Sequence, residues 1–378
     1  MMIKKIIYMR TTLAIILISF ICTACHDRKK NSNETICAEN IETLSLIVDE
    51  KDSTSADFVE FVDFLKLKEP DLTFNTITKL LIHNDTIYLF DKFGSNIVMS
   101  FDMDGNHIAN YSRRGKSKSE YIRLFDFDVD DNYVYLYDRM KKKMLLYNHN
   151  GDFEKDIPTS FYGDGFAVLK NGSFLFSLGR DNGIAKLCLT DSNLEIQKVL
   201  LKYKEEDKGD LLVSNLFQKC NDTIFYNVPL SDVVYRFSLD GEYIGAYELD
   251  FNGTNIPDEK KYSYEVLASS KEEYKYTYID DCPLFVNNKM IVPVSKKGER
   301  SILYYDLIKK TGGVKSWENK SLCINDIIAP LYVDDIYIIG RMNLTLFDYI
   351  KVRDEIPDDI INYLQNGNTI LIFYQMKK

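Results

Sequence analysis

An internal repeat constrains the fold of this 378-residue chain more than any other feature of its sequence. The segment TIYLFD at Thr86–Asp91 returns as YVYLYD at Tyr133–Asp138, so the step is 138 minus 91, or 47 residues. A strand and turn, VVYRFSLDGEYI, starts at Val233, and a degenerate copy at 173–196 fills the interval before it. A period of about 40–50 residues is typical of repeat folds, in which each copy is one small structural unit.

The repeat continues into the C-terminal part of the chain and predicts an all-β fold. Copies begin at Lys289, with KMIVPVSKKGERSILYYDL, and at Asp335, with DIYIIGRMNLTLFDYI, which makes six copies. Three turns are Asp-Gly or Asn-Gly pairs: Asp104-Gly105, Asn150-Gly151 and Asp240-Gly241. Such pairs supply the positive φ angles that tight hairpins need. Six copies of short hairpin-linked strands predict a six-bladed β-propeller of four-stranded antiparallel blades.

The two ends of the repeat region are expected to close the ring. FVEFVDFLKL at 58–67 is a strand without a partner in its own copy, and TILIFYQMKK at 369–378 is another. Both are predicted to lie in the same last blade, because a closed ring leaves few open strand edges. The propeller domain is therefore predicted to span residues 56–378.

One long interruption separates two copies, at Asp250–Cys282. Its segment DEKKYSYEVLASSKEEYKY is charged, poor in turn residues and partly helical in pattern. We expect an insertion that contains a helix on one face of the ring. Insertions on one face of a repeat fold often form its binding face.

The N-terminus predicts export. Lys4, Lys5 and Arg10 precede the apolar stretch TTLAIILISFI, which is too short to span a membrane stably and is followed by CTAC. This arrangement resembles a bacterial lipoprotein signal over residues 1–24, in which Cys25 becomes the lipidated first residue. The alternative is ordinary secretion with Cys22 as one of the small residues at the cleavage site. Export by either route would remove this segment from the mature chain.

The residues after the signal are expected to be a tether. HDRKKNSNET follows Cys25, and we predict a flexible segment over 25–55 that joins the membrane to the propeller. An acidic run would resemble a surface-export signal, whereas this run is basic. The expected location is the cell envelope, lipid-anchored and facing the periplasm rather than the surface.

Charge and cysteine content narrow the possible partners. The net charge of −10 argues against nucleic-acid binding, which needs a basic surface. Two of the seven cysteines are used by the signal and the lipid, and the other five cannot all pair. They are interpreted as small buried apolar residues, with one disulfide left open. We expect a monomer with no cofactor.

Several of these segments together resemble a known family. FVEFVDFLKL, the blade IYLFD…FDMDGNHI and GKSKSEYIRLFDFDVD are similar to bacterial six-bladed β-propeller lipoproteins, distant relatives of NHL-repeat propellers. Members usually carry G-x-G-x-G-E-[YF] where this chain has Gly115–Tyr121, with Ser117 and Ser119 in place of two glycines. The resemblance implies the propeller fold, and for most members no activity is established.

The stretch YSRRGKSKSEYIRLFDFDVDDN offers the strongest candidates for a chemical site. GKS at Gly115–Ser117 lacks the glycine that a phosphate loop needs five positions earlier, where Asn110 stands. Four acids follow with apolar residues between them: Asp126, Asp128, Asp130 and Asp131. This alternation indicates a strand with one packed face rather than a calcium loop. A metal held by such acids in the propeller channel is the alternative.

Other catalytic signatures are weak. The four histidines are dispersed and form no H-x-x-x-H motif, so a zinc lyase is disfavoured, and no G-x-S-x-G elbow occurs. The basic run RRGKSK is interpreted as a solvated loop, or as a contact to an anionic partner through Arg113, Arg114 and Lys116. No catalytic, cofactor-binding or metal-binding residue is assigned.

Two functions remain open. The first is a non-enzymatic binding module at the cell envelope, which presents a propeller face and its insertion to a protein or glycan ligand. The second is an envelope lyase or hydrolase that acts on a glycan or peptide in the channel. Three or more acids or imidazoles converging within metal-binding distance in the channel would favour the enzyme.

Overall fold

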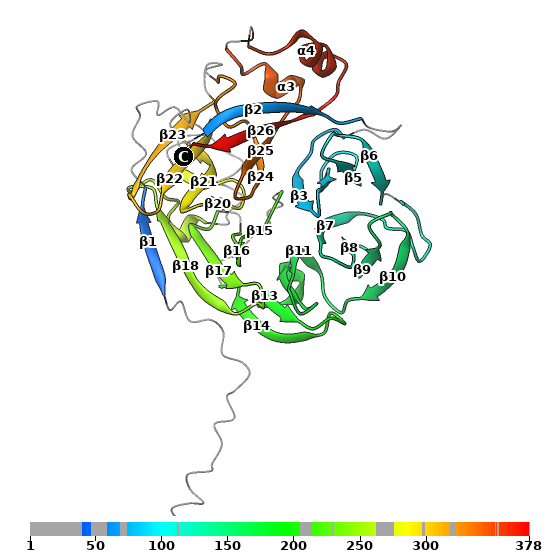
Figure 1. Cartoon of the computed structure of the whole chain (residues 1–378). Helices are drawn as coiled ribbons and strands as arrows, with labels where there is room; N and C mark the ends of the chain where they lie inside the picture. The colour runs from blue at the N-terminus through cyan, green and yellow to red at the C-terminus, as the bar shows by residue number, and fades with distance from the viewer. Residues whose placement is uncertain are drawn as a thin grey trace, which may run out of the picture. The chain divides into compact units, whose positions relative to one another are not determined.

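The computed structural model describes residues 40–46, 59–68, 74–111, 113–204, 214–228, 230–261, 276–296, 299–317, 322–351, 353 and 355–377. Six sheets, antiparallel except for one added edge strand in the fourth, stand side by side around a common axis (Figure 1). The innermost strands are β3 (Lys79–His83), β7 (Leu124–Val129), β11 (Gly163–Val168), β15 (Phe217–Cys220), β20 (Leu284–Val286) and β24 (Pro330–Val333). Each contacts the next, and β24 contacts β3, which closes the ring. The predicted six-bladed β-propeller is therefore confirmed.

The first three blades follow the chain in order. The first comprises β3 (Lys79–His83), β4 (Thr86–Phe90), β5 (Val98–Asp102) and β6 (His107–Asn110). The second comprises β7 (Leu124–Val129), β8 (Val134–Asp138), β9 (Lys143–Tyr147) and β10 (Phe153–Pro158). The third comprises β11 (Gly163–Val168), β12 (Phe174–Leu178), β13 (Ala185–Thr190) and β14 (Ile196–Lys202), with the 3-10 helix η2 (Arg180–Asn182) between β12 and β13.

The other three blades contain extra strands or helices besides the four-stranded pattern. The fourth comprises β15 (Phe217–Cys220), β16 (Thr223–Tyr226), β17 (Val233–Ser238), β18 (Tyr243–Asp250) and β1 (Ile41–Ser45); the 3-10 helix η3 (Asp258–Lys260) follows β18. The fifth comprises β20 (Leu284–Val286), β21 (Lys289–Lys296), β22 (Glu299–Asp306), β23 (Thr311–Ser316) and β19 (Thr277–Ile279). The sixth comprises β24 (Pro330–Val333), β25 (Tyr337–Met342), β26 (Ile370–Met376) and β2 (Val59–Lys66), with helices α3 (Leu344–Phe347) and α4 (Asp358–Gln365) between β25 and β26.

Local sequence explains the blades. Every residue of β8, β9 and β12 is buried, because each blade packs between two neighbours and both faces of its middle strands are covered. The predicted turn glycines adopt positive φ angles of 76° at Gly105, 88° at Gly151 and 83° at Gly241. Glycine takes these angles at little steric cost, so the hairpins form where the sequence predicts them.

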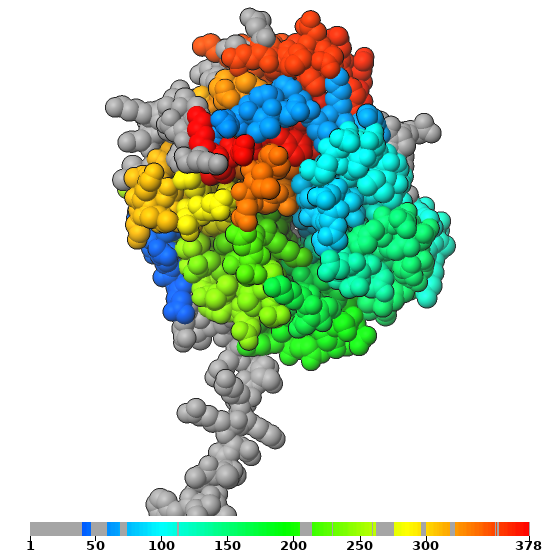
Figure 2. Space-filling view, in the orientation of Figure 1, coloured from blue at the N-terminus to red at the C-terminus, as the bar shows by residue number. Residues whose placement is uncertain are grey.

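The two ends close the ring as predicted. β2 pairs antiparallel with β26, from Val59 opposite Met376 to Lys66 opposite Ile370. Figure 2 shows the blue β2 lying against red and orange segments from the other end of the chain. Because β25 pairs with the other edge of β26, the C-terminal strand has a partner on both sides.

The sixth copy departs from the prediction. Residues 344–347 were expected in its second strand, but they form α3. The Asn343 side chain accepts a hydrogen bond from the Leu346 backbone nitrogen at 3.0 Å, which caps the start of a helix. The strand position is filled instead by β26 from the end of the chain.

The expected tether over 25–55 also needs correction. Ile41–Ser45 within it forms β1, which pairs in parallel with β18 at the outer edge of the fourth blade. Leu44 and Leu46 are buried in an apolar cluster between the fourth and fifth blades, which explains why this segment is ordered as a strand. The signal over 1–24 and Cys25 lie outside the described residues, as does 262–275, where most of the predicted helix of the insertion falls.

The described cysteines are free thiols: Cys188, Cys220, Cys282 and Cys323. Cys188 and Cys282 are buried, as expected for small apolar residues. Within the described ranges, no helix combines the length and apolar character needed to cross a membrane.

Candidate functional site

The loop Gly115–Tyr121 is a folded connector between the first and second blades. The Gly115 nitrogen donates to the Tyr121 carbonyl at 2.9 Å, and the Tyr121 nitrogen donates to the Arg113 carbonyl at 2.9 Å. Glu120 Oε2 accepts from the Ser117 nitrogen at 2.7 Å. A Cβ atom at position 115 would lie 2.0 Å from Glu120 Oε2, so this glycine is needed for the carboxylate to approach. The contacts within this connector thus explain why the signature has glycine at position 115, glutamate at 120 and tyrosine at 121.

The predicted contact residues Arg113, Arg114 and Lys116 are exposed on this connector. Arg114 Nη2 donates to the Ser95 carbonyl at 2.6 Å, and Arg113 Nη2 lies 3.5 Å from the Gly151 carbonyl. Both guanidinium groups therefore help to hold the connector on neighbouring turns. Their contact with an anionic partner stays a prediction.

Asp126 joins three blades. It lies in β7 at the inner edge of the second blade, where Oδ1 accepts from Lys79 Nζ of the first blade at 2.7 Å. Its Oδ2 accepts from the Phe166 nitrogen of the third blade at 3.0 Å. Both side chains of the ion pair are only 6% exposed. Both oxygens of the Asp126 carboxylate accept hydrogen bonds from other blades. The carboxylate is therefore poorly placed to act on a ligand.

Asp128, two residues further along β7, likewise links its strand to two other blades. Its Oδ2 accepts from the Val168 nitrogen at 2.7 Å and from Lys219 Nζ at 2.5 Å. The strand was expected to have one packed face, but all six of its residues are buried, because the acids face other blades across the inside of the ring. Buried carboxylates are tolerated here because each has a cation and backbone donors.

The last two acids of the run lie at a turn. Asp130 Oδ1 accepts from the Asn132 and Tyr133 nitrogens at 2.8 and 2.9 Å. Asp131 lies 3.1 Å from His83 Nε2 and its side chain is 83% exposed. Within the part of the chain that the structure describes, no three His, Cys, Asp or Glu side chains are grouped to hold a metal ion. The metal alternative therefore gains no support from these acids.

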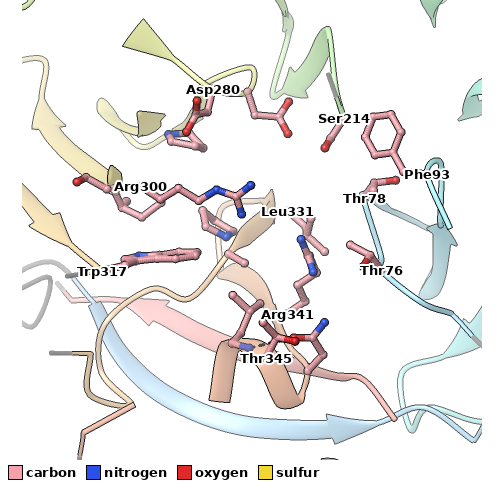
Figure 3. Close-up of a pocket in the computed structure, with 18 residues that line it drawn as sticks. Thr76, Thr78, Phe93, Ser214, Asp280, Arg300, Trp317, Leu331, Arg341 and Thr345 are labelled. Carbon is pink, nitrogen blue, oxygen red and sulfur yellow. Dashed lines mark hydrogen bonds between the residues drawn. The ribbon is translucent and has the colours of Figure 1, made fainter. Parts of the chain in front are cut away.

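A pocket of about 580 Å³ lies where the inner strands of several blades begin. Its lining includes Thr78 just before β3, Ser214 before β15, Asp281 before β20 and Leu331 at the start of β24. In antiparallel blades these starts share one end of the ring with the connections between blades. The pocket thus lies on the same face as the insertion after β18. Figure 3 shows labelled polar side chains pointing into its open space.

An interrupted strand supplies the acids of this pocket. Ile279 pairs with Val294, and Leu284 pairs with Ile291. Four residues, 280–283, therefore stand opposite only two on β21. Such bulges re-aim side chains and are over-represented beside active sites. The interruption includes Pro283, which has no N–H to give to a ladder.

Both acids of the bulge have perturbed pKa values. Burial raises the pKa of Asp281 to about 7, although its Oδ1 accepts from the Asn215 and Cys282 nitrogens at 2.9 Å each. Burial raises the pKa of Asp280 to about 6, and the charge of Arg300 opposes this rise. Two carboxyl groups with raised pKa values in one pocket favour a functional site.

Asn215 follows the pocket residue Ser214 in the sequence and is hydrogen-bonded to residues of two other blades. It belongs to the segment before β15 in the fourth blade, yet its Nδ2 donates to the Thr78 carbonyl of the first blade at 3.0 Å. Its backbone nitrogen donates to Asp281 of the fifth blade. Its Oδ1 is buried without a hydrogen-bond partner. Asn215 therefore ties the first, fourth and fifth blades together.

Two arginines face the acids. Arg300 lies in β22 and Arg341 in β25, and both guanidinium groups point into the open space in Figure 3. Burial and the nearby charge of Arg300 lower the pKa of Arg341 to about 10. Neither arginine forms an ion pair with any residue the structure describes. The pocket therefore contains cationic charge that the protein itself does not fully neutralise.

Aromatic side chains complete the walls. Trp317 follows β23 and is 8% exposed, while Phe93, between β4 and β5, is 46% exposed. Within the described part of the chain, Nε1 of Trp317 and Nε of Arg341 are buried and have no hydrogen-bond partner. Aromatic walls with a few convergent polar groups are typical of small-molecule sites.

Sequence reasoning missed most of this pocket. Arg113, Arg114 and Lys116 are absent from its lining, whereas Arg300 and Arg341 were not singled out. The insertion was expected on the binding face, and two residues near its end, Asp280 and Asp281, do line the pocket. The available signal was the pair of acids followed by a proline in an otherwise strand-like segment.

The ring and its pocket define a six-bladed β-propeller with a polar, aromatic-walled site at one end of its inner strands. The chain belongs to the family described as domain of unknown function DUF4934, which it matches over residues 39–374. None of the curated proteins matches it. The relation to NHL-repeat propellers stays a prediction.

Solved structures share the fold. A protein inferred to be exported, from Bacteroides fragilis NCTC 9343, is 20% identical with a TM-score of 0.70, covering 89% of this chain and 100% of that one. A DUF4221 family member from Bacteroides vulgatus ATCC 8482 is 10% identical with a TM-score of 0.52, covering 85% of this chain and 99% of that one. At these identities the likeness concerns the fold alone.

Proposed function

We propose that this protein is an exported binding module, anchored to the cell envelope by lipid on Cys25, that takes a protein or glycan ligand into the pocket lined by the first, fourth, fifth and sixth blades. The observation that carries the proposal is the presence of Arg300 and Arg341 in that pocket without an ion-pair partner among the described residues. Arg300 is exposed and Arg341 is half-buried. A half-buried cation such as Arg341 costs stability when it has no ion-pair partner, and an anionic group on a ligand would offset that cost.

The anchor is supported by the sequence pattern around Cys25 and has its own test. Cells that express the full chain are labelled with radioactive palmitate and the protein is isolated. The wild-type chain is expected to carry label, and Cys25→Ala to carry none. If the wild-type chain stays unlabelled while a known lipoprotein in the same cells is labelled, the anchor proposal fails and ordinary secretion replaces it.

Ligand binding is tested with the mature chain carrying Cys25→Ser, which cannot be lipidated. A panel of envelope glycans and acidic peptides is screened by thermal shift and then by calorimetry. Ligands that bind the parent protein are expected to bind Arg341→Met at least tenfold more weakly, because the fork of charged donors is lost. Arg123→Met, which changes an exposed arginine outside the pocket lining, should leave affinity unchanged.

Two outcomes would contradict this proposal. Equal binding by Arg341→Met and the parent protein would place the ligand elsewhere on the molecule. Failure of every panel member to bind would remove support for a binding module of this kind. Circular dichroism and thermal unfolding of Arg341→Met are needed alongside, because a partly buried side chain is changed.

A second function, an envelope hydrolase or lyase, is favoured by one observation. Asp280 and Asp281 share the pocket and have pKa values raised toward neutrality, as acid–base catalysts do. The same panel distinguishes the two functions. A product released by the parent protein and not by Asp281→Asn, with ligand binding retained, would favour the enzyme. Intact ligands recovered after long incubation would favour the binding module.

A further inference from the structure

The charge of the pocket selects the class of ligand. Arg300 and Arg341 come from neighbouring blades, and their mutual repulsion is one of the causes that lower the pKa of Arg341. A single anion placed between them would remove that repulsion and would accept hydrogen bonds from both guanidinium groups. Arginine is suited to this role because its planar fork matches carboxylate and phosphate groups.

The acids of the same pocket favour a carboxylate over a phosphate. A phosphate monoester carries a charge of about −1.5 to −2 near neutral pH, whereas a carboxylate carries about −1. Asp280 and Asp281 would repel the larger charge more strongly. As hydrogen-bond acceptors, they instead suit a ligand that presents hydroxyl donors beside its anionic group. The combination of one carboxylate and several hydroxyls is the chemistry of a sugar acid.

The aromatic side chains of the pocket wall suit a sugar ring. Phe93 offers an exposed aromatic face from the first blade, and Trp317 lies at another part of the pocket in the fifth blade (Figure 3). The C–H face of a pyranose can pack against such side chains while its hydroxyls reach polar groups. A small movement that lets Trp317 Nε1 and Arg341 Nε donate to ligand oxygens would also satisfy two buried donors that have no partner.

We propose that the pocket binds a sugar acid, such as a uronic acid unit of a glycan, with its carboxylate between Arg300 and Arg341 and its ring against the aromatic wall that includes Phe93. This inference rests on the proposed function and narrows it to one ligand class. The pocket volume of about 580 Å³ lies within the range of roughly 300–1,000 Å³ that small-molecule sites occupy.

The test uses probes that separate the parts of the ligand. The mature Cys25→Ser chain is titrated calorimetrically with D-glucuronate, D-galacturonate, D-glucose, acetate and inorganic phosphate. At least one uronate is expected to bind at least tenfold more tightly than glucose, which lacks the carboxylate, and than acetate, which lacks the ring. Phosphate is expected to bind more weakly than that uronate.

The variants locate the contacts. Arg300→Met and Arg341→Met should each weaken uronate binding at least tenfold, and Phe93→Ala several-fold. Arg341→Lys keeps the charge but loses the fork, so an intermediate affinity is expected, and this variant guards against a folding defect in Arg341→Met. The control Arg123→Met should bind like the parent protein.

Each result bears on the inference. Glucose binding as tightly as the uronates, or phosphate binding more tightly, would overturn it. If phosphate or an acidic peptide binds and Arg341→Met abolishes that binding, the sugar-acid assignment fails while the proposed binding function stands. If no probe and no member of the wider panel binds through the pocket, both fail together.

Discussion

Removal of residues 370–378, which takes away β26, is expected to abolish folding of the propeller. Residues 370–374 are buried between β25 and β2 and between neighbouring blades. Burial of one large apolar side chain is worth about 1.5–3 kcal/mol, so these five are worth roughly 8–15 kcal/mol together. The whole free energy of unfolding of a protein is typically about 5–15 kcal/mol. The loss is therefore as large as the stability available.

A shorter truncation is the matched control for this experiment. Removing only Lys377 and Lys378 leaves every residue of β26 in place and should leave the melting temperature within about 2 °C of the full chain, a change of less than about 1 kcal/mol. Far-ultraviolet circular dichroism and resistance to limited proteolysis report on both variants. A chain that ends at Thr369 and still unfolds cooperatively near the normal temperature would show that strand pairing between the two ends does not hold the ring together.

Asp126→Leu is expected to lower the free energy of unfolding by about 3–5 kcal/mol. The change leaves the charge of Lys79 buried without its carboxylate partner, because both side chains of this pair are only 6% exposed. It also removes the acceptor of the Phe166 nitrogen in the third blade. Denaturant unfolding followed by tryptophan fluorescence and by circular dichroism measures the loss.

Asp131→Asn provides the contrast within the same short stretch of sequence. Asp131 contacts His83 at 3.1 Å, but its side chain is 83% exposed, so its loss should cost less than about 0.5 kcal/mol. The double variant Lys79→Met, Asp126→Leu should recover part of the stability lost by Asp126→Leu, since an apolar pair replaces the unpaired charge. Equal losses for Asp126→Leu and Asp131→Asn would refute a special role for the buried pair.

The run of acids shows how far sequence reasoning reached and where it stopped. The alternation around Asp126 and Asp128 predicts a strand, and β7 is that strand. The partners of these acids come from β3, β11 and β15, and no local pattern relates Lys79 or Lys219 to them. Only the ring brings these positions together, so their role in joining blades required the tertiary structure.

The sixth blade gives a second example. The apolar pattern of TLFDYI is compatible with a strand, and the competing helix signal is a single capping residue, Asn343. Closure of the ring decides between strand and helix. The C-terminal strand β26 occupies the third position of the blade, counted outward from β24. A short apolar segment that has lost its strand position to another segment is free to follow its local helix signal.

By itself, the sequence determined the number of blades, the hairpin turns and the pairing of the two ends. These features depend on short-range rules: strand periodicity, positive φ at turn glycines, and the requirement that no strand edge stay open. The tertiary structure alone decided the candidate site. Arg300, Arg341, Asp281 and Phe93 belong to three different blades, and their meeting depends on ring geometry and on a strand interruption at 280–283. Local rules fix each blade, but only the packing of blades around one axis places charges from distant segments in a common pocket.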